Sequence, residues 1–145
     1  MSVELPYAPV DAIIRRNADG LRVSAEATEA LARELQFHGA TLGVAAAANA
    51  DADGRKTLME EDFPVEHSLT REELTLPIAP VDRIARLEIE DRYLVSMDAR
   101  VALATVLERY ADEVAEAATL LAEHAERRTI SEQDIRTYLS LCGDE

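Results

Sequence analysis

The chain has 145 residues, of which 48% are hydrophobic, and it carries a formal net charge of −14 at pH 7. No stretch approaches the roughly 18 to 20 apolar residues needed to cross a bilayer, and the first residues have neither the basic nor the apolar segment of a signal peptide. We therefore expect a soluble, intracellular protein without a membrane partner. The negative charge by itself argues against nucleic acid as a partner, because it repels phosphate and suits hydration in concentrated salt.

A tandem duplication organises the chain. Residues 5–16 return 71 positions later as residues 76–87, with eight of the twelve identical, and shared Val-Ser, Ala-Leu-Ala and basic-Thr motifs continue the match to the end of each half. A half of about 70 residues lies near the size at which one small core supplies little stability. We therefore predict one unit made of both copies, with the first repeat at 1–67, a linker at 68–75 and the second repeat at 76–145.

The first half is predicted to begin with a short helix that follows a Leu-Pro-x-Ala-Pro-Val motif at Leu5. Ser24 then stands as the N-cap of a long helix with an apolar stripe. Pro64 falls where a third helix should continue. Because proline removes an amide donor and clashes with the preceding turn, we expect that helix to be shortened or displaced, and the polar residues that follow Pro64 to act as a connector.

The second half repeats this order. Apolar residues at three- and four-residue steps predict a long helix from about Ser96 to Ala125, roughly 45 Å long at 1.5 Å per residue. Ser131 and Asp134 have the spacing of a capping box and open a last helix that ends at about Leu141. The predicted fold class is therefore all-α. A stripe along so long a helix has to be covered by a second such helix, which the other copy supplies.

Residues for catalysis or metal binding are few. There is no Gly-rich phosphate loop, no paired acid and base and no activated nucleophile, so an enzyme is the least favoured class of function. Cys142 lacks a nearby base. His38, His67 and His124 share no metal-ligand spacing with Cys142, and we expect neither a metal nor another cofactor.

The repeated motifs resemble those of the archaeal histones. The resemblance rests on Leu-Pro-x-Ala-Pro-Val before a short helix, Val-Ser before a long one, and Gly54-Arg-Lys-Thr57 followed by Glu60 and Asp62. Two such units in one acidic chain are similar to the tandem, or doublet, histones of halophilic archaea. The resemblance implies two histone folds that clasp head to tail as an intramolecular handshake pseudo-dimer. The first loop of one half would then lie beside the second loop of the other.

The same resemblance implies a DNA-binding face made by the paired loops and by the N-termini of the first helices, where amides and basic side chains receive phosphates. A charge count supports it, because ten of the fifteen basic residues fall in these segments. These ten are Arg15, Arg16, Arg22, Arg55, Lys56, Arg83, Arg86, Arg92, Arg127 and Arg128. The predicted DNA-binding set takes all of them except Arg92 and adds Thr57 and Thr129. The alternative interpretation of this basic stripe is a set of solvated loops.

The two copies differ within this face. The family pairs an Arg of the first helix with the Thr of the partner half's second loop, the Arg entering the minor groove. Arg83 would meet Thr57 in this way, but Ala12 leaves Thr129 without a mate. The Arg before Val-Ser is likewise present as Arg22 and replaced by Leu94. We therefore expect DNA contacts that are uneven and weaker than is usual in the family.

Two further sets of residues follow from the resemblance. Ion pairs of Arg55 with Asp62 and of Arg127 with Asp134 would brace the second loops. Leu121, His124 and Asp134 would form the contact that joins one dimer to the next. The first half has Asn49 and Ala52 in place of the Leu and the His, so we expect a homodimer of two chains joined through their second halves, with growth stopping there.

The function that these residues favour is that of a DNA-binding histone with largely sequence-independent contacts. It would act in chromatin organisation or as a modulator of transcription, in the cytoplasm on the chromosome. With about six phosphates neutralised, affinity would fall about five decades for each tenfold rise in salt, so binding in a saline cytoplasm should be weak. The alternative is a histone-fold interaction module that binds protein partners and little or no DNA.

Overall fold

A computed structural model of the chain describes residues 2–143. The regular elements, in chain order, are α1 (Tyr7–Arg16), β1 (Arg22–Val23), α2 (Ala25–Ala52), β2 (Thr57–Leu58), the 3-10 helix η1 (Glu60–Asp62), α3 (Ile78–Ala85), β3 (Leu94–Val95), α4 (Met97–His124), β4 (Thr129–Ile130) and α5 (Glu132–Cys142). The fold is mostly helical, as predicted. No helix within residues 2–143 is long and apolar enough to span a bilayer.

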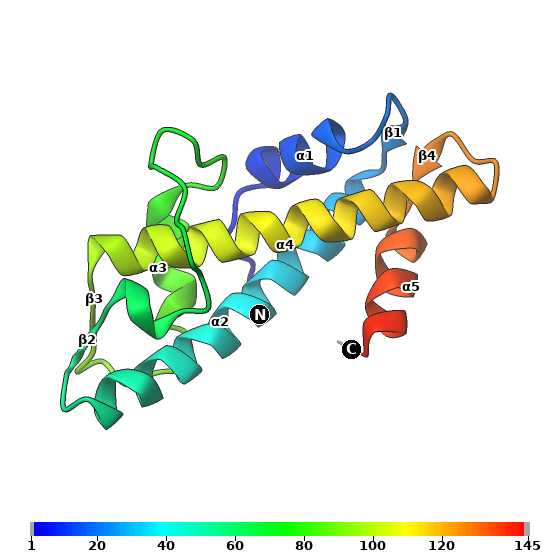
Figure 1. Ribbon diagram of the computed structural model, residues 1–145. Coiled ribbons are helices and arrows are strands. Elements are labelled where there is room, and N and C mark those ends of the chain that lie inside the picture. The colour runs from blue at the N-terminus through cyan, green and yellow to red at the C-terminus, as the bar shows by residue number, and fades with distance from the viewer. Residues whose placement is uncertain (1, 144–145) are drawn as a thin grey trace.

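The two long helices, α2 and α4, form the frame of the molecule and cross one another (Figure 1). Each has 28 residues, and each begins at a serine whose hydroxyl accepts a hydrogen bond from the amide three residues on: Ser24 from Ala27 at 3.0 Å and Ser96 from Ala99 at 3.1 Å. The rings of His38 and Tyr110, each the fourteenth residue of its helix, stack with centroids 4.3 Å apart. The helices therefore meet at their middles.

Two short parallel strand pairs join the halves. β1 pairs with β4, with Arg22 opposite Thr129, and β2 pairs with β3, with Thr57 opposite Leu94. Figure 1 shows the two pairs at opposite ends of the elongated molecule. Each pair satisfies backbone groups that the neighbouring helix ends leave unbonded, so the first loop of each half is fastened to the second loop of the other.

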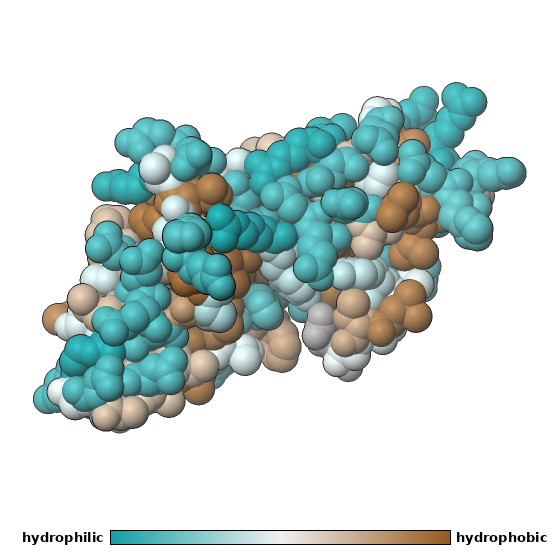
Figure 2. All heavy atoms as spheres, viewed as in Figure 1, coloured by the Kyte–Doolittle hydropathy of each residue, from teal (hydrophilic) through white to brown (hydrophobic). Residues whose placement is uncertain are grey.

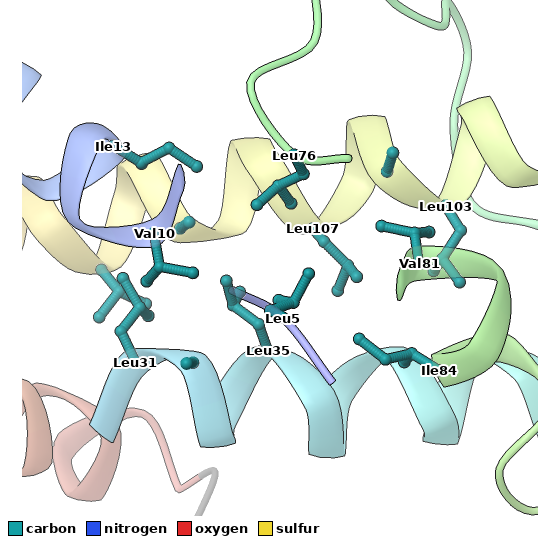
Figure 3. Close-up of a cluster of buried hydrophobic side chains, with 14 of the residues drawn as sticks. Leu5, Val10, Ile13, Leu31, Leu35, Leu76, Val81, Ile84, Leu103 and Leu107 are labelled. Carbon is teal, nitrogen blue, oxygen red and sulfur yellow. The ribbon is translucent and has the colours of Figure 1, made fainter. Parts of the chain in front are cut away.

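The core is built from the same positions of both copies. Residues are equivalent when their numbers differ by 71 before the shared Val-Ser, and by 72 from there on. Five equivalent pairs point into the space between the long helices in Figure 3: Leu5 and Leu76, Val10 and Val81, Ile13 and Ile84, Leu31 and Leu103, and Leu35 and Leu107. All ten are buried. Neither half could cover these side chains alone, since each set is covered by the other.

The halves differ in their third helix. α5 packs against both long helices, but the equivalent segment of the first half is only the single turn η1, followed by buried Phe63 and by Pro64. The predicted shortening at the proline is confirmed. No helix or strand follows until Ile78. Instead residues 63–77, which we call the connector, lie along α4, where the amide of Leu69 donates to the hydroxyl of Thr105 at 3.0 Å.

A buried polar residue stands at the same place in both long helices. In α2, Oε1 of Gln36 accepts from the Glu4 amide at 2.7 Å. In α4 the equivalent residue is Glu108, and its Oε1 accepts from the amides of Thr75 and Leu76 at 2.7 and 3.0 Å. Each side chain thus holds the extended segment that leads into the first helix of its own half. Because buried amides need partners, these contacts fix where α1 and α3 begin.

Candidate nucleic-acid interface

One end of the molecule carries the β1–β4 pair and three of the predicted DNA-binding residues. The amide of Arg22 donates to the carbonyl of Arg128 at 2.9 Å, and Thr129 lies opposite Arg22. Both arginine side chains are exposed, and neither has a carboxylate partner within residues 2–143. Hydrophilic side chains project from this end in Figure 2. Two unneutralised guanidinium groups on adjoining backbones make a small cationic site.

The turn before β4 shows why this end holds its shape. Glu126 adopts a φ of 59°, in the left-handed region that favours glycine. Its equivalent at the other end of the molecule is Gly54, with a φ of 71°. A non-glycine residue pays about 1 kcal/mol or more for this conformation, so the two ends reach the same backbone path from different residues.

The opposite end carries the β2–β3 pair and fewer cations. The amide of Leu94 donates to the carbonyl of Lys56 at 2.9 Å, and Thr57 lies opposite Leu94. Lys56 is exposed and has no carboxylate partner among the described residues. Leu94, which is 62% exposed, occupies the place that Arg22 has at the first end. The two ends are therefore unequal in charge.

Seven of the ten basic residues of the predicted stripe are neutralised by carboxylates of the chain itself. They are Arg15 with Asp11, Arg16 with Glu108 and Asp112, Arg55 with Asp53 and Asp62, Arg83 with Glu4, Arg86 with Asp82, Arg92 with Asp51 and Glu90, and Arg127 with Asp134. Within residues 2–143, this leaves only Arg22, Lys56 and Arg128 of the ten without an ion pair. The stripe exists as a set of positions, but most of its charge is compensated.

Arg83 differs from expectation. Its guanidinium donates to Glu4 at 2.8 Å, and within the described residues it makes no hydrogen bond to Thr57. The N-terminal segment, which Gln36 holds against α2, brings that carboxylate to α3. The sequence carries no periodic signal for this contact, because the two residues lie 79 positions apart.

Arg16 is also withdrawn from solvent ligands. It donates to both carboxylate oxygens of Asp112 at 2.9 and 2.8 Å, to Glu108 at 3.3 Å and to the hydroxyl of Thr75 at 3.0 Å. These contacts raise the pKa of Arg16, chiefly through the Asp112 hydrogen bonds. The side chain joins α1 to α4 and to the connector, which is a structural use of a residue predicted to bind DNA.

Both second loops contain the ion pair that the resemblance implies. Arg55 lies 2.9 Å from Asp62, whose other oxygen accepts from the Met59 amide at 2.8 Å. Arg127 contacts Asp134, which also accepts from the Ser131 amide at 2.8 Å. Burial alone would raise the pKa of each aspartate. The arginine and amide hydrogen bonds, with the arginine charge, outweigh it and hold the pKa of both below the ordinary value.

A depressed carboxylate pKa predicts a specific acid sensitivity. The ionised aspartates stabilise the folded chain fully above the unfolded pKa, about 3.9, and this contribution is lost as the pH falls through their lower folded values. We expect Asp62→Asn with Asp134→Asn to lower the free energy of unfolding at pH 7 and to make it fall less between about pH 5 and pH 2. Urea unfolding across this range measures the slope. The exposed pair Asp19→Asn and Asp91→Asn is the control, and equal slopes in the two double variants would contradict the assignment.

The N-termini of α1 and α3 differ from those of the other α-helices in residues 2–143. Pro6 and Pro77 precede them, no side chain caps them, and their first turns contain no acidic residue. In contrast, α2, α4 and α5 each have a serine cap and an acidic first turn. Open amides at a helix N-terminus attract anions, so the two first helices keep the feature that phosphate binding needs.

The predicted chain–chain contact lies at the end of α4. Leu121 is half-buried, His124 is the exposed last residue of the helix, and Asp134 is buried against Arg127. Leu120 and Leu141, which sequence reasoning did not single out, are more exposed than Leu121. In the first half, the side chain of Asn49 donates to the carbonyl of Asp62 at 3.0 Å, which ties the loop to the helix instead of leaving an apolar surface.

Chemistry other than anion binding has little support in the described part of the chain. No group of three or more His, Cys, Asp or Glu side chains there is placed to hold a metal ion. Cys142 is exposed and unpaired with another cysteine.

Comparisons with known proteins agree with the geometry. A family model described as histone-like transcription factor (CBF/NF-Y) and archaeal histone matches twice, at residues 3–64 and 74–139. The archaeal histone HAN1 of Thermococcus zilligii is 51% identical over 61 residues, which cover 42% of this chain and 88% of that protein. The crystal structure of the histone from Methanopyrus kandleri is similar over 90% of each chain, with 26% identity and a TM-score of 0.65. A Thermus thermophilus protein of known crystal structure, at 18% identity, shares the fold, with 97% of each chain covered and a TM-score of 0.73.

Proposed function

Because this chain belongs to the family of histone-like transcription factors and archaeal histones, we propose that it is a chromatin protein that binds double-stranded DNA, as a doublet of two histone folds paired within one chain in the handshake arrangement. Its acidity suits the saline cytoplasm of a halophilic archaeon, where it would be associated with the chromosome and would organise DNA or modulate transcription. Its contacts would be to phosphates and the minor groove and largely independent of sequence.

The observation that carries this proposal is the pair of free guanidinium groups at Arg22 and Arg128. They lie on hydrogen-bonded backbones at the end of the molecule. Phosphate contacts come from such side chains, from loop amides and from helix N-termini, and they position a protein on DNA without reading bases. The uncapped starts of α1 and α3 add two further anion-binding positions.

The pattern of ion pairs sets the strength of binding. A phosphate that approaches Arg15 or Arg86 competes with an aspartate four residues away on the same helix. With about three unpaired cations, affinity should fall by a little less than three decades for each tenfold rise in salt, instead of the five that six contacts would give. The protein therefore binds weakly at low salt but loses less as salt rises.

Removing the free arginines tests the proposal. We expect Arg22→Ala with Arg128→Ala to weaken binding to a random-sequence duplex at least tenfold at low salt and to lower the salt slope by about two. The matched control, Arg15→Ala with Arg86→Ala, removes the same charge from residues already paired with Asp11 and Asp82 and should weaken binding less. Fluorescence anisotropy over a range of KCl concentrations gives both quantities. DNA binding that is absent at every salt concentration, or unchanged in the first double variant, contradicts the function.

The second candidate is a histone-fold interaction module with little or no DNA binding. The neutralised stripe favours it, since seven of the ten cations already have carboxylate partners within the chain. It predicts that the parent protein gives no anisotropy change even at the lowest salt. The same titration therefore separates the two candidates.

We propose that two chains associate through their second halves, around Leu121, His124 and Asp134, to form a homodimer of doublets. Replacing Leu121 with Asn and His124 with Ala gives the second half the residues that the first half carries at these positions. The mass by light scattering should then fall from two chains to one, because the apolar contact is lost. His67→Ala, at an exposed connector residue, should leave the mass unchanged. A double variant that remains dimeric would contradict this mode of association.

A further inference from the structure

The outward surface of α2 lacks charge over most of its length. Residues 35–50 contain no acidic or basic side chain other than His38, in a chain whose net charge is −14. Five exposed residues at helical spacing form what we call the α2 outer face: Phe37, Thr41, Val44, Ala45 and Ala48. Phe37 and Val44 are 64% and 46% exposed. Pale brown atoms run along this part of the molecule in Figure 2.

The same surface of α4 shows that the fold does not require this composition. The equivalent residues are Arg109, Glu113, Glu116, Ala117 and Leu120, so three of the five are charged. All of them except the half-buried Ala117 are exposed. A solvated helix surface is normally polar. The loss of charge therefore belongs to the first half alone.

Packing on the other side of α2 leaves the outer face uncovered. Gly39 and Gly43 lie against α3, where a Cβ at Gly43 would come within 2.3 Å of the Ala85 carbonyl oxygen. The close contacts of the helix are thus made on its inner side, and no element within residues 2–143 buries Phe37 or Val44.

We propose that the α2 outer face binds the same face of a second copy of this chain, with the two α2 helices antiparallel. Contact elsewhere would bring carboxylates together, whereas this face can be apposed to itself without like charges. In an antiparallel pair centred between Leu42 and Gly43, Phe37 of one chain lies over Ala48 of the other, and Thr41 lies opposite Val44. Small residues opposite a large one allow the helices to approach closely.

Charge at the ends of the face is complementary in this arrangement. Arg33 lies one turn before Phe37, and the antiparallel pairing brings it to Asp51 of the second copy. Arg33 is held only loosely by Glu29, at 4.0 Å, with both side chains more than half exposed. Asp51 uses one oxygen, Oδ2, for its contacts with Arg92 and Tyr93, and Oδ1 takes no hydrogen bond within the described residues. Two Arg–Asp pairs would therefore close the contact at both ends.

The contact has an unusual dependence on salt. Two chains of charge −14 repel each other at long range, and salt screens this repulsion while apolar association remains. Association through the α2 outer face should strengthen as salt rises, in the opposite direction to DNA binding. The proposal is independent of DNA binding and uses a different surface from the Leu121 and His124 contact.

The experiment is sedimentation equilibrium of the full chain carrying Leu121→Asn and His124→Ala, which removes the other contact. We expect its dimerisation constant to increase at least tenfold between about 0.1 M KCl, where the Debye length is about 10 Å, and about 1 M, where it is about 3 Å. Adding Phe37→Glu with Val44→Glu should leave a single chain at both salt concentrations. Adding Leu94→Glu with Met97→Glu, at exposed apolar residues outside the face, changes the net charge equally and should leave association intact.

Circular dichroism establishes that each variant is folded. If Phe37→Glu with Val44→Glu is not folded, Val44→Glu alone replaces it, since α4 carries a glutamate, Glu116, at that position. Association of the face variant as strong as that of the control, or no association of the background chain even at high salt, would overturn the proposal. Neither result bears on whether the chain binds DNA.

Discussion

Replacing Glu108 with alanine is expected to lower the free energy of unfolding by about 3 kcal/mol. The side chain is 2% exposed and accepts hydrogen bonds from the amides of Thr75 and Leu76 and from the guanidinium of Arg16. Without it, the buried Leu76 amide loses its partner, and an unsatisfied buried donor costs about 1–3 kcal/mol. Denaturant unfolding followed by circular dichroism measures the loss.

Glu108→Gln separates the two kinds of contact. A glutamine keeps an oxygen for both amides but loses the charge that faces Arg16, so we expect a loss of only about 1 kcal/mol. The first half already has Gln36 at this position, with its oxygen bound to the Glu4 amide. If the glutamine variant were as unstable as the alanine variant, the ion pair with Arg16 would be the dominant contact, contrary to this account.

Replacing Gly43 with alanine should destabilise the protein by about 2 kcal/mol, although alanine is the better helix former by about 1 kcal/mol. The new methyl group would stand 2.3 Å from the carbonyl oxygen of Ala85. Because that atom belongs to the backbone of α3, relief requires the two helices to separate. The equivalent residue of α4 is Ala115, so this change makes the halves more alike and still weakens the fold.

Gly39→Ala is the matched control for this prediction. Its methyl group would meet side-chain atoms of Ile84 and Leu107 at 2.6 and 3.1 Å, and side chains can move more easily than backbone. Thermal unfolding should show a smaller decrease in Tm for Gly39→Ala than for Gly43→Ala. A Gly43→Ala protein as stable as the parent would show that α2 and α3 do not make backbone contact.

The repeat predicts the fold well because it constrains every level at once. Apolar positions shared by both copies, such as Leu31 and Leu103, are the ones that face each other across the long helices. Capping serines and Pro64 mark element ends through local backbone chemistry, which acts within a few residues. Such signals are legible without knowledge of the tertiary structure.

The candidate interface was predictable by position but not by charge. A count of cations places ten on one face, and only the three-dimensional arrangement shows which have partners. Asp11 with Arg15 and Asp82 with Arg86 lie four residues apart on helices, so this part of the neutralisation had a sequence signal. Glu4 with Arg83 and Asp112 with Arg16 are long-range pairs that arise from packing, and no local pattern announces them.

The buried polar residues were the clearest omission. Gln36 and Glu108 interrupt an apolar stripe at the same position in both repeats, and a polar residue that recurs inside a stripe is a signal for a specific hydrogen-bond partner. Their partners, however, are backbone amides of a segment that has no regular structure, which a search for side-chain pairs does not find.

The connector also bears on how chains share their halves. Two copies of a tandem protein can exchange halves and so form swapped dimers, a hazard that depends on the hinge between them. Here the hinge is short and is fastened along α4 by Thr105 and Glu108, which keeps the effective concentration of the first half beside its own second half high. Partner choice is thereby settled during folding of a single chain, and the pairing does not depend on how much protein the cell contains.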